Sequence, residues 1–333
     1  MTLQTRKPTG AVPWPLVLIE GEEKAGKTWA CAEFTASKKV GRSFWIDLGE
    51  GAADEYGAIP GARYEVVEHD GSWAALYSSV AEIHRIAAEA LARKEKPVVL
   101  IIDTMTSEWD LLKDWAADRA KSTKSNRRRL EADPNAEVVI TGNLWNDANA
   151  RHRKLMGLLK TFPGIALLTA HGKQVAVIGP DGQPVEGQKT HKVEAQKSLG
   201  ADASCWLRLY RESPGVIVGG RSVHLKFRPG DDAKPLASDW TLEGIVFDVL
   251  QCDPASAHVR DLVAPKADAV TPEQIRDEAL EKNTGHARIR ELYTEAKRLG
   301  YDDVTLMNET GEDELLLALL IRVGGERKPA AAA

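Results

Sequence analysis

The stretch Gly21-Glu-Glu-Lys-Ala-Gly-Lys-Thr28 follows the apolar run Pro15-Leu-Val-Leu-Ile19 and opens a segment with helical spacing, Thr28 to Ser37. Glycines at this spacing let backbone N–H groups close around phosphate oxygens, the lysine reaches the β- and γ-phosphates, and the threonine hydroxyl ligates magnesium. A glycine-rich turn is the alternative, but the position between strand and helix favours a nucleotide. We therefore expect ATP and Mg²⁺ as ligands, with contacts from Gly21, Glu22, Glu23, Lys24, Ala25, Gly26, Lys27 and Thr28.

Three further apolar runs, 43–47, 97–103 and 164–170, have the length of strands that are buried on both faces of a parallel sheet. Between and after them, apolar residues recur at helical spacing in the segments 72–93, 107–119 and 146–162. Strands and helices thus alternate along the chain. This alternation predicts an α/β fold with a mainly parallel, twisted sheet.

Polar residues follow the predicted strands where those strands end. Asp103 is placed to hold magnesium together with the loop threonine, although an acid here is also typical of a helix N-cap. Asp47 and Glu50 are candidate bases for the attacking water; we favour Glu50, although both could be solvated loop acids. Thr169 and His171 are candidate contacts to the γ-phosphate, while a lone histidine at a strand end is often structural.

The later part of the chain changes character. From Val175 to Arg228, short alternating stretches with turn signals predict an antiparallel extension of the sheet. Thr271-Pro-Glu-Gln predicts the start of a helix, with Thr271 as N-cap. The expected organisation is an N-terminal arm at 1–13, a core at 14–252, a linker at 253–270, a small helical module at 271–323, which looks like a helical hairpin, and a disordered tail at 324–333.

Composition narrows the class of protein. The 333 residues carry 43% apolar and 28% charged residues and a formal net charge of −5, so any nucleic-acid surface must be local. The three cysteines, Cys31, Cys205 and Cys252, are far apart and predict neither a disulfide framework nor a zinc site. No apolar signal core or membrane-spanning stretch occurs, so we expect a cytoplasmic protein without a membrane partner.

Taken together, these motifs resemble the RecA-like recombinase core, and most closely the short phage-encoded RecA-like ATPases described as single-strand annealing proteins. The resemblance covers about residues 14–250. Besides the Gly21 loop, it rests on four stretches: Phe44-Trp-Ile-Asp-Leu-Gly-Glu50, Ile101-Ile-Asp-Thr-Met-Thr106, Leu168-Thr-Ala-His171 and Val223-His-Leu-Lys-Phe-Arg228. The loop and the Ile101 stretch are typical of P-loop ATPases in general, and the others narrow the choice only in combination.

The resemblance implies roles for further residues. In this family a late strand carries cations that reach the nucleotide of a neighbouring subunit, which maps onto Lys226 and Arg228 as catalytic residues beside Lys27 and Glu50. Two solvated cations on a surface strand are the alternative. One departure matters: RecA itself has its catalytic glutamate two residues after the strand aspartate, where this sequence has Gly49, and the acid follows one residue later.

The resemblance also implies a path for single-stranded DNA along two basic regions that follow the magnesium strand and the sensor strand. Charge runs are usually solvated faces, but two runs in the expected places favour contacts to phosphates. The residues are Lys121, Lys124, Arg127, Arg128, Arg129, Lys173, Lys189, Lys192 and Lys197.

The function that these expectations favour is a DNA-stimulated ATPase that assembles head to tail, as a ring or filament, on single-stranded DNA and supports recombination or annealing. A single-strand-binding protein is a candidate partner. Two alternatives stay open: a hexameric helicase or packaging-type motor on the same core, and a nucleotide-dependent module that loads a partner with little turnover.

Overall fold

The computed structural model describes residues 3, 5–228, 230–262 and 270–328. The chain divides into two compact units, residues 1–262 and residues 263–333. Within the described ranges, no helix combines the length and the apolarity that crossing a bilayer requires.

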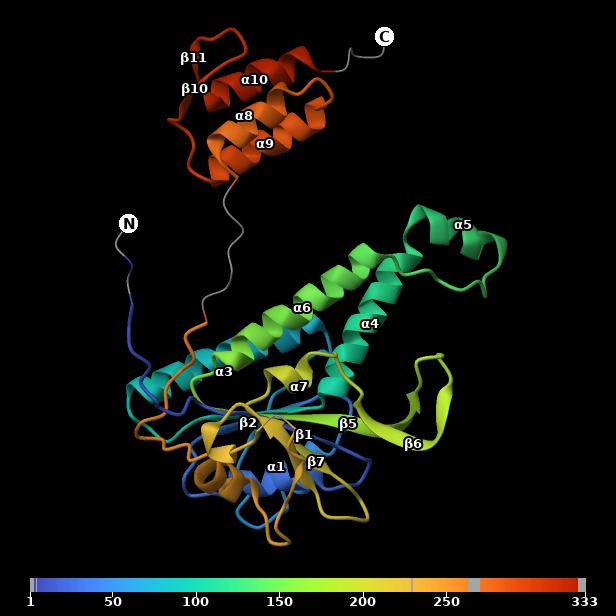
Figure 1. Ribbon diagram of the computed structural model, residues 1–333, viewed down its shortest axis with the longest axis vertical. Coiled ribbons are helices and arrows are strands. Elements are labelled where there is room, and N and C mark those ends of the chain that lie inside the picture. Colours follow the sequence, from blue (N-terminus) through green and yellow to red (C-terminus); the bar gives the residue numbers. More distant parts are fainter. Residues whose placement is uncertain (1–2, 4, 229, 263–269, 329–333) are drawn as a thin grey trace. The chain divides into compact units, whose positions relative to one another are not determined.

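The first unit is built on a nine-stranded sheet (Figure 1). Its order is β3-β2-β4-β5-β1-β7-β8-β9, with β6 paired to β5. The strands up to β7 in this order run parallel, whereas β8, β9 and β6 pair antiparallel. The bounds are β1 Leu16–Gly21, β2 Ser43–Asp47, β3 Glu65–Val66, β4 Val99–Asp103, β5 Ile165–Ile178, β6 Pro184–Val193, β7 Cys205–Leu209, β8 Val216–Gly220 and β9 Lys234–Pro235. The parallel sheet and its antiparallel extension confirm the fold class predicted from the sequence.

Helices cover both faces of this sheet, which is why β1 is buried along its whole length. Val17 and Ile19 pack on the side of α1 (Lys27–Thr35) and the π-helix η2 (Gly244–Val249), while Leu16 and Leu18 pack on the side of α3 (Trp73–Ala92) and α6 (Gly142–Lys160). The alternation follows from the two-residue period of a strand. Short helices α2 (Ala53–Tyr56) and α7 (Leu199–Asp202) complete the layers.

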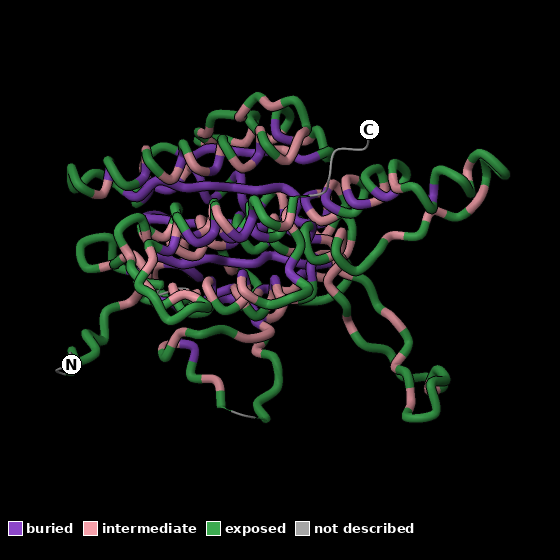
Figure 2. The backbone as a smooth tube through the Cα atoms, turned by 90° about the horizontal axis from the view of Figure 1, so that it is seen from above, coloured by how far each residue is buried: buried purple, intermediate pink, exposed green. Residues whose placement is uncertain are grey.

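Two extensions project from the core. Both begin on the side of the sheet to which the carboxyl ends of the central parallel strands point. The helical extension consists of α4 (Met105–Lys121), which follows β4, then α5 (Lys124–Ala132) and the first turns of α6. The hairpin extension is the second half of β5 with β6, where the burial of β5 gives way to exposure. Figure 2 shows both extensions mostly exposed, in contrast to the buried strands.

The segment 124–132, which carries most of the first predicted basic region, is helical. Thr123 accepts a hydrogen bond from the Asn126 backbone N–H as its N-cap. Asn126 is buried, and its amide donates to the carbonyl oxygens of Ala120 and Val139 at 2.9 and 2.8 Å. One buried amide thus anchors α5, which explains why no apolar stripe announces this helix in the sequence.

The stretch 223–228, predicted as a strand, is a 3-10 turn, η1 (Val223–Leu225), followed by Lys226 in a left-handed conformation. Ser222 caps the turn by accepting from the backbone N–H of His224 at 3.2 Å. Lys226 and Arg228 therefore do not share one strand face. Their sequence alternates like a strand, but only Leu225 is buried, because local turn hydrogen bonds replace the sheet ladder.

Residues 253–262, predicted as the first part of a linker, pack on the first unit. The backbone N–H of Trp14 donates to the carbonyl of His258 at 3.0 Å, and Pro13 pairs with His258 in an isolated bridge. The end of the predicted arm is therefore tied to this segment. Residues 263–269, the rest of the predicted linker up to Val270, lie outside the described residues.

In its described part, residues 270–328, the second unit contains three helices, α8 (Pro272–Leu280), α9 (His286–Arg298) and α10 (Leu316–Glu326), and the hairpin of β10 (Thr305–Met307) and β11 (Asp313–Leu315). Thr271 and Gln274 form a capping box at the predicted helix start. The fold is thus larger than the helical hairpin expected from the sequence. Residues 324–326, predicted as disordered tail, form the last turn of α10, and residues 329–333 lie outside the described part.

Candidate active site

The carboxyl ends of β1, β2 and β4 lie beside His171 in the middle of β5, because these strands are parallel and adjacent or nearly adjacent in the sheet. A cavity of about 200 Å³ opens there. Its walls come from the residues Glu23 to Thr28, from the segment after β2, from the end of β4 and from His171 in the middle of β5. Polar groups from four separate strands thus meet in one cavity, as is typical of open α/β sheets.

The backbone of the loop requires glycine at two places. A Cβ on Gly21 would lie 2.1 Å from the carbonyl oxygen of Leu209, so only glycine fits where β1 passes β7. Gly26 has a φ of 89° and stands at the N-cap of α1. No side chain of the described residues caps this helix. Its first N–H groups are therefore free to bind phosphate oxygens, which the helix dipole also favours.

Lys27 is held in place by the loop itself. Its side chain is 7% exposed, and its ammonium donates to the carbonyl oxygens of Gly21 and Glu22 at 3.0 and 2.8 Å. Burial lowers the pKa of Lys27, and the nearby carboxylate of Asp103 is the strongest influence that opposes the fall. The two residues whose carbonyls hold Lys27 do not line the cavity, whereas the other six residues of the predicted loop do.

Asp103 ends β4 with a carboxylate that is 1% exposed. One oxygen, Oδ1, accepts a hydrogen bond from the Thr169 hydroxyl, while Oδ2 is buried without a partner among the described residues. Burial raises the pKa of Asp103, and the nearby hydroxyl groups of Thr169 and Thr28 partly oppose the rise. A buried carboxylate oxygen without a donor, next to a loop threonine, fits the ligand shell of a magnesium ion or of its bound water.

The helix-cap alternative for Asp103 does not hold. The side chain of the next residue, Thr104, caps α4 by accepting from the backbone N–H of Ser107 at 3.1 Å. Thr169 also differs from expectation. It is fully buried, does not line the cavity and donates to Asp103, so it positions the carboxylate and does not contact a γ-phosphate directly.

The structure separates the two acids that follow β2. Asp47 accepts hydrogen bonds from the backbone N–H groups of Glu50 and Gly51 at 3.0 Å and of Ala53 at 3.2 Å, so it shapes the loop. Glu50 lines the cavity, and its Oε1 lies 2.9 Å from Nε2 of His171. Glu50 and His171 thus face the same space from two strand ends, and the geometry favours Glu50 over Asp47 as the base.

Two aromatic residues near the cavity were missed in the sequence. Tyr56 of α2 lines it, and Trp29, which directly follows the loop threonine, lies edge-on to Tyr56 with ring centroids 6.1 Å apart. Trp29 is 51% exposed. An aromatic residue immediately after the phosphate loop is a signal that could have been read, because exposed rings near a nucleotide site are suited to stack on a base.

A buried ion pair lies directly before the phosphate loop in β1. Glu20 of β1 is fully buried and pairs with Arg208 of β7. Gly172 of β5 makes room for it, because a Cβ there would lie 2.1 Å from Glu20 Oε2. Glu20 thus contacts both strands that flank β1, namely β7 through Arg208 and β5 at Gly172, next to Gly21.

The predicted DNA-contacting residues divide between the two extensions. Lys121, Lys124, Arg127, Arg128 and Arg129 belong to α4 and α5, and Lys173, Lys189 and Lys192 to the β5–β6 hairpin, with Lys197 after it. Lys121 lies 2.8 Å from Asp118, and Lys173 pairs with Glu194. The remaining members make no ion pair within the described part of the chain.

Comparison with known proteins assigns the chain to a protein family. A model of the AAA domain family matches residues 15–231, which is well over half of the chain. The chain belongs to this family. The match spans the phosphate loop, both candidate metal ligands and the two extensions. It supports the predicted nucleotide-binding ATPase core, whereas the closeness to phage annealing proteins stays a prediction.

Solved structures similar to this AAA-domain protein include the RadB recombinase, at 12% identity and a TM-score of 0.35 over 63% of this chain and 83% of that one. A second is a prototypical ATPase from the type III secretion system of pathogenic bacteria, at 15% identity and a TM-score of 0.38 over 61% of this chain and 55% of that one. Neither likeness is strong enough to assign a role. No curated protein sequence matches the chain at a significant level.

Proposed function

We propose that this AAA-domain protein binds and hydrolyses Mg·ATP and uses it to act on single-stranded DNA in recombination or strand annealing. The observation that carries the proposal is the convergence of Lys27, Asp103 and Glu50 on one cavity at adjacent strand ends. Phosphate-binding, metal-binding and base groups are the three parts that nucleotide hydrolysis needs.

The residues divide the chemistry between them. Backbone N–H groups of the loop and the Lys27 ammonium bind the phosphates, and Thr28 and Asp103 would hold magnesium. When bound, the ion neutralises charge on the phosphate oxygens. Glu50 accepts the proton of the attacking water, and His171, 2.9 Å away, orients the Glu50 carboxylate. Lys27 keeps its position because the loop carbonyls already hold it, so little reorganisation accompanies binding.

The DNA part of the proposal rests on the two extensions. Both begin at the strand ends that form the nucleotide cavity, since α4 follows Asp103 and β5 continues past His171. Their exposed cations stand out in a chain with a formal net charge of −5. Contacts of cations to the phosphate backbone without base readout are typical of binding to single strands.

Head-to-tail assembly is the remaining part. We retain Lys226 and Arg228 as cations that reach the nucleotide of a neighbouring subunit, now presented by the turn after η1. A subunit with Lys27→Ala that keeps both cations should partly rescue a subunit with the opposite defects. No rescue at any mixing ratio, with assembly confirmed by light scattering, would contradict action in trans.

The decisive experiment is an ATPase assay with and without single-stranded DNA. We expect turnover that the DNA stimulates. Turnover near zero in both conditions, with ATP still bound, would instead identify a nucleotide-dependent loading module. Directional unwinding of a forked duplex, in place of annealing of complementary strands, would identify a helicase or motor.

A further inference from the structure

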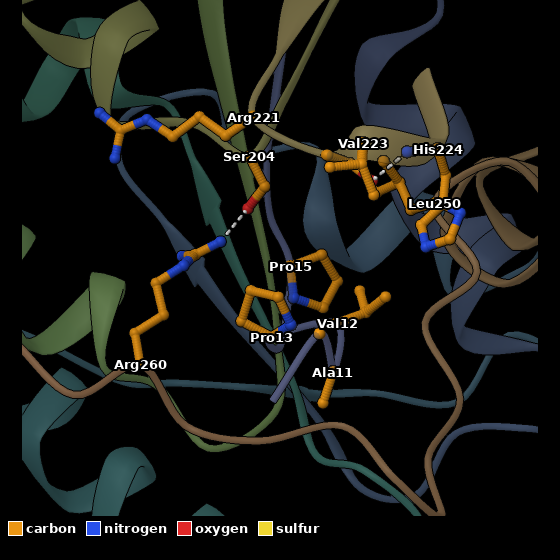
Figure 3. Close-up of a pocket in the computed structure, with 12 residues that line it drawn as sticks. Ala11, Val12, Pro13, Pro15, Ser204, Arg221, Val223, His224, Leu250 and Arg260 are labelled. Carbon is orange, nitrogen blue, oxygen red and sulfur yellow. Dashed lines mark hydrogen bonds between the residues drawn. The ribbon is translucent and has the colours of Figure 1, made fainter. Parts of the chain in front are cut away.

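A second cavity, of about 390 Å³, is shown in Figure 3. The nucleotide cavity lies at the carboxyl end of β1, whereas this second cavity lies at the amino ends of β1 and β7. Its walls come from residues 10–13, from the starts of β1 and β7, and from the segment after β8. β1 has six residues, so the two cavities are separated by roughly 20 Å of strand. The proposed function assigns no role to this second cavity.

Three polar side chains form one wall of this cavity. Ser204 Oγ accepts from the backbone N–H of Leu16 and from Nη2 of Arg260, both at 2.7 Å. A hydroxyl has two acceptor lone pairs and one hydrogen to donate. Both lone pairs of Ser204 are therefore used, and its hydrogen has no acceptor within the described ranges. The O–H is free to donate to a ligand.

The same wall carries two positive charges without a matching acid. Arg221 and Arg260 both line the cavity; Arg221 donates to the backbone carbonyl of Ala201 and Arg260 to Ser204 Oγ, but neither forms an ion pair with any carboxylate that the structure describes. Burial lowers the pKa of Arg260, and the charge of Arg221 lowers it further. Two guanidinium groups that repel each other, one of them beside a buried hydroxyl, are stabilised when an anion binds near them.

The facing wall is mainly apolar, with the imidazole of His224 as a polar member beside Leu250. Pro13, Pro15 and Leu250 line it, and Val223, which is 82% exposed, stands at the rim. Figure 3 shows these side chains across the cavity from Arg260 and Ser204. Apolar walls with a few convergent polar groups are typical of small-molecule sites, and the volume lies in their range.

We propose that this cavity is a binding site for a small organic anion, a carboxylate or phosphate ester with an apolar body. Arg221, Arg260 and the Ser204 hydroxyl hold the charged group, and the prolines and Leu250 contact the body. The site does not depend on the nucleotide cavity, so it stands or falls separately from the proposed ATPase activity.

The test is isothermal titration calorimetry with phenyl phosphate, whose body and charge match the two walls. A Lys27→Ala background removes phosphate binding in the nucleotide loop. We expect phenyl phosphate to bind in this background, and both inorganic phosphate and uncharged benzyl alcohol to bind at least about tenfold more weakly. Arg221→Gln should weaken phenyl phosphate about tenfold, because a charge-assisted hydrogen bond is lost.

Arg260→Gln gives a second, deeper probe, and its melting temperature reports whether the fold survives. Arg221 is exposed, so Arg221→Gln keeps the test valid even if the deeper variant unfolds. Phenyl phosphate affinity that is unchanged in Arg221→Gln, or absent from the parent protein, would overturn the site. Inorganic phosphate that binds as tightly as phenyl phosphate would overturn the proposed class of ligand.

Discussion

The nucleotide cavity and the two extensions differ in the burial and the bonding of their charged side chains. Lys27 and Asp103 are almost fully buried and are held by loop carbonyls and by Thr169. Lys124 and Arg128 on α5 are exposed and bind no partner among the described residues. Buried groups are pre-positioned for one ligand geometry, whereas solvated cations suit a ligand with repeated charges and no fixed register. Substitutions in the cavity should therefore abolish ATP binding or hydrolysis. Substitutions in the extensions should only weaken the affinity for single-stranded DNA.

The largest effect is expected from Lys27→Ala. It removes the buried cation of the loop, so ATP affinity should fall by about 100-fold or more, measured by calorimetry. Lys24→Asn is the matched control, because Lys24 is exposed and asparagine tolerates its positive φ of 59°. We expect less than about a tenfold loss there. Wild-type ATP turnover in the Lys27→Ala variant would contradict the assignment of this cavity as the nucleotide site.

Glu50→Gln should slow hydrolysis by roughly 100-fold or more while ATP affinity stays nearly intact, because general-base help is typically worth that much. Single-turnover kinetics separate the two quantities. Asp47→Asn is the comparison. It weakens three loop hydrogen bonds, so it should lower the free energy of unfolding by about 1 kcal/mol with a smaller effect on the rate. The reverse pattern would make Asp47 the base.

Asp103→Asn should make the nucleotide-free protein more resistant to heat while removing stabilisation by Mg·ATP. The pKa of Asp103 is raised in the folded state, so the wild type carries a destabilising buried charge above that pKa. This penalty is lost as pH falls through the folded pKa towards the unfolded value. The difference in melting temperature between variant and wild type should therefore shrink at acidic pH. A variant that is less stable than the wild type at neutral pH would contradict the assignment.

Within the helical extension, Lys124 and Arg128 lie one helical turn apart on one face of α5. Replacing both by Ala should lower the slope of log affinity against log salt by about 1.4, at 0.7 per phosphate contact to a single strand. Consecutive helical residues point about 100° apart, so replacing Arg127, Arg128 and Arg129 together should remove less than the roughly two units that three contacts would supply. Fluorescence anisotropy on a labelled oligonucleotide measures the slope, and an unchanged value would make α5 an ordinary solvated helix.

The smallest effect is expected in the hairpin extension, where two lysines that differ in their ion pairing can be compared. Lys173 is paired with Glu194, whereas Lys189 is exposed and makes no ion pair in the described chain. Lys189→Ala should lower the salt slope by about 0.7 and Lys173→Ala by clearly less, because an intramolecular partner competes with the phosphate. Equal effects would show that the Lys173 pair opens on binding.

Sequence reasoning was most successful where the structure depends on contiguous residues. The loop, its flanking strand and helix, and the helix start with Thr271 as N-cap all follow from local spacing. It was less successful where hydrogen bonds of single polar side chains, and not an apolar pattern, set the course of the backbone. Helix α5 lacks an apolar stripe and is anchored by Asn126 to Val139, and the stretch after Ser222 alternates like a strand but turns.

The sequence alone determined the phosphate loop, the strand that ends at Asp103 and the α/β class, because glycine spacing and apolar periodicity act within a few residues. Only the tertiary structure decided that Glu50 faces the cavity while Asp47 holds the loop, although both follow β2. It also brought Ser204, Arg221 and Arg260 to one cavity wall. The register between strands and the direction of each side chain set these arrangements, and both are fixed by packing of residues distant in the chain.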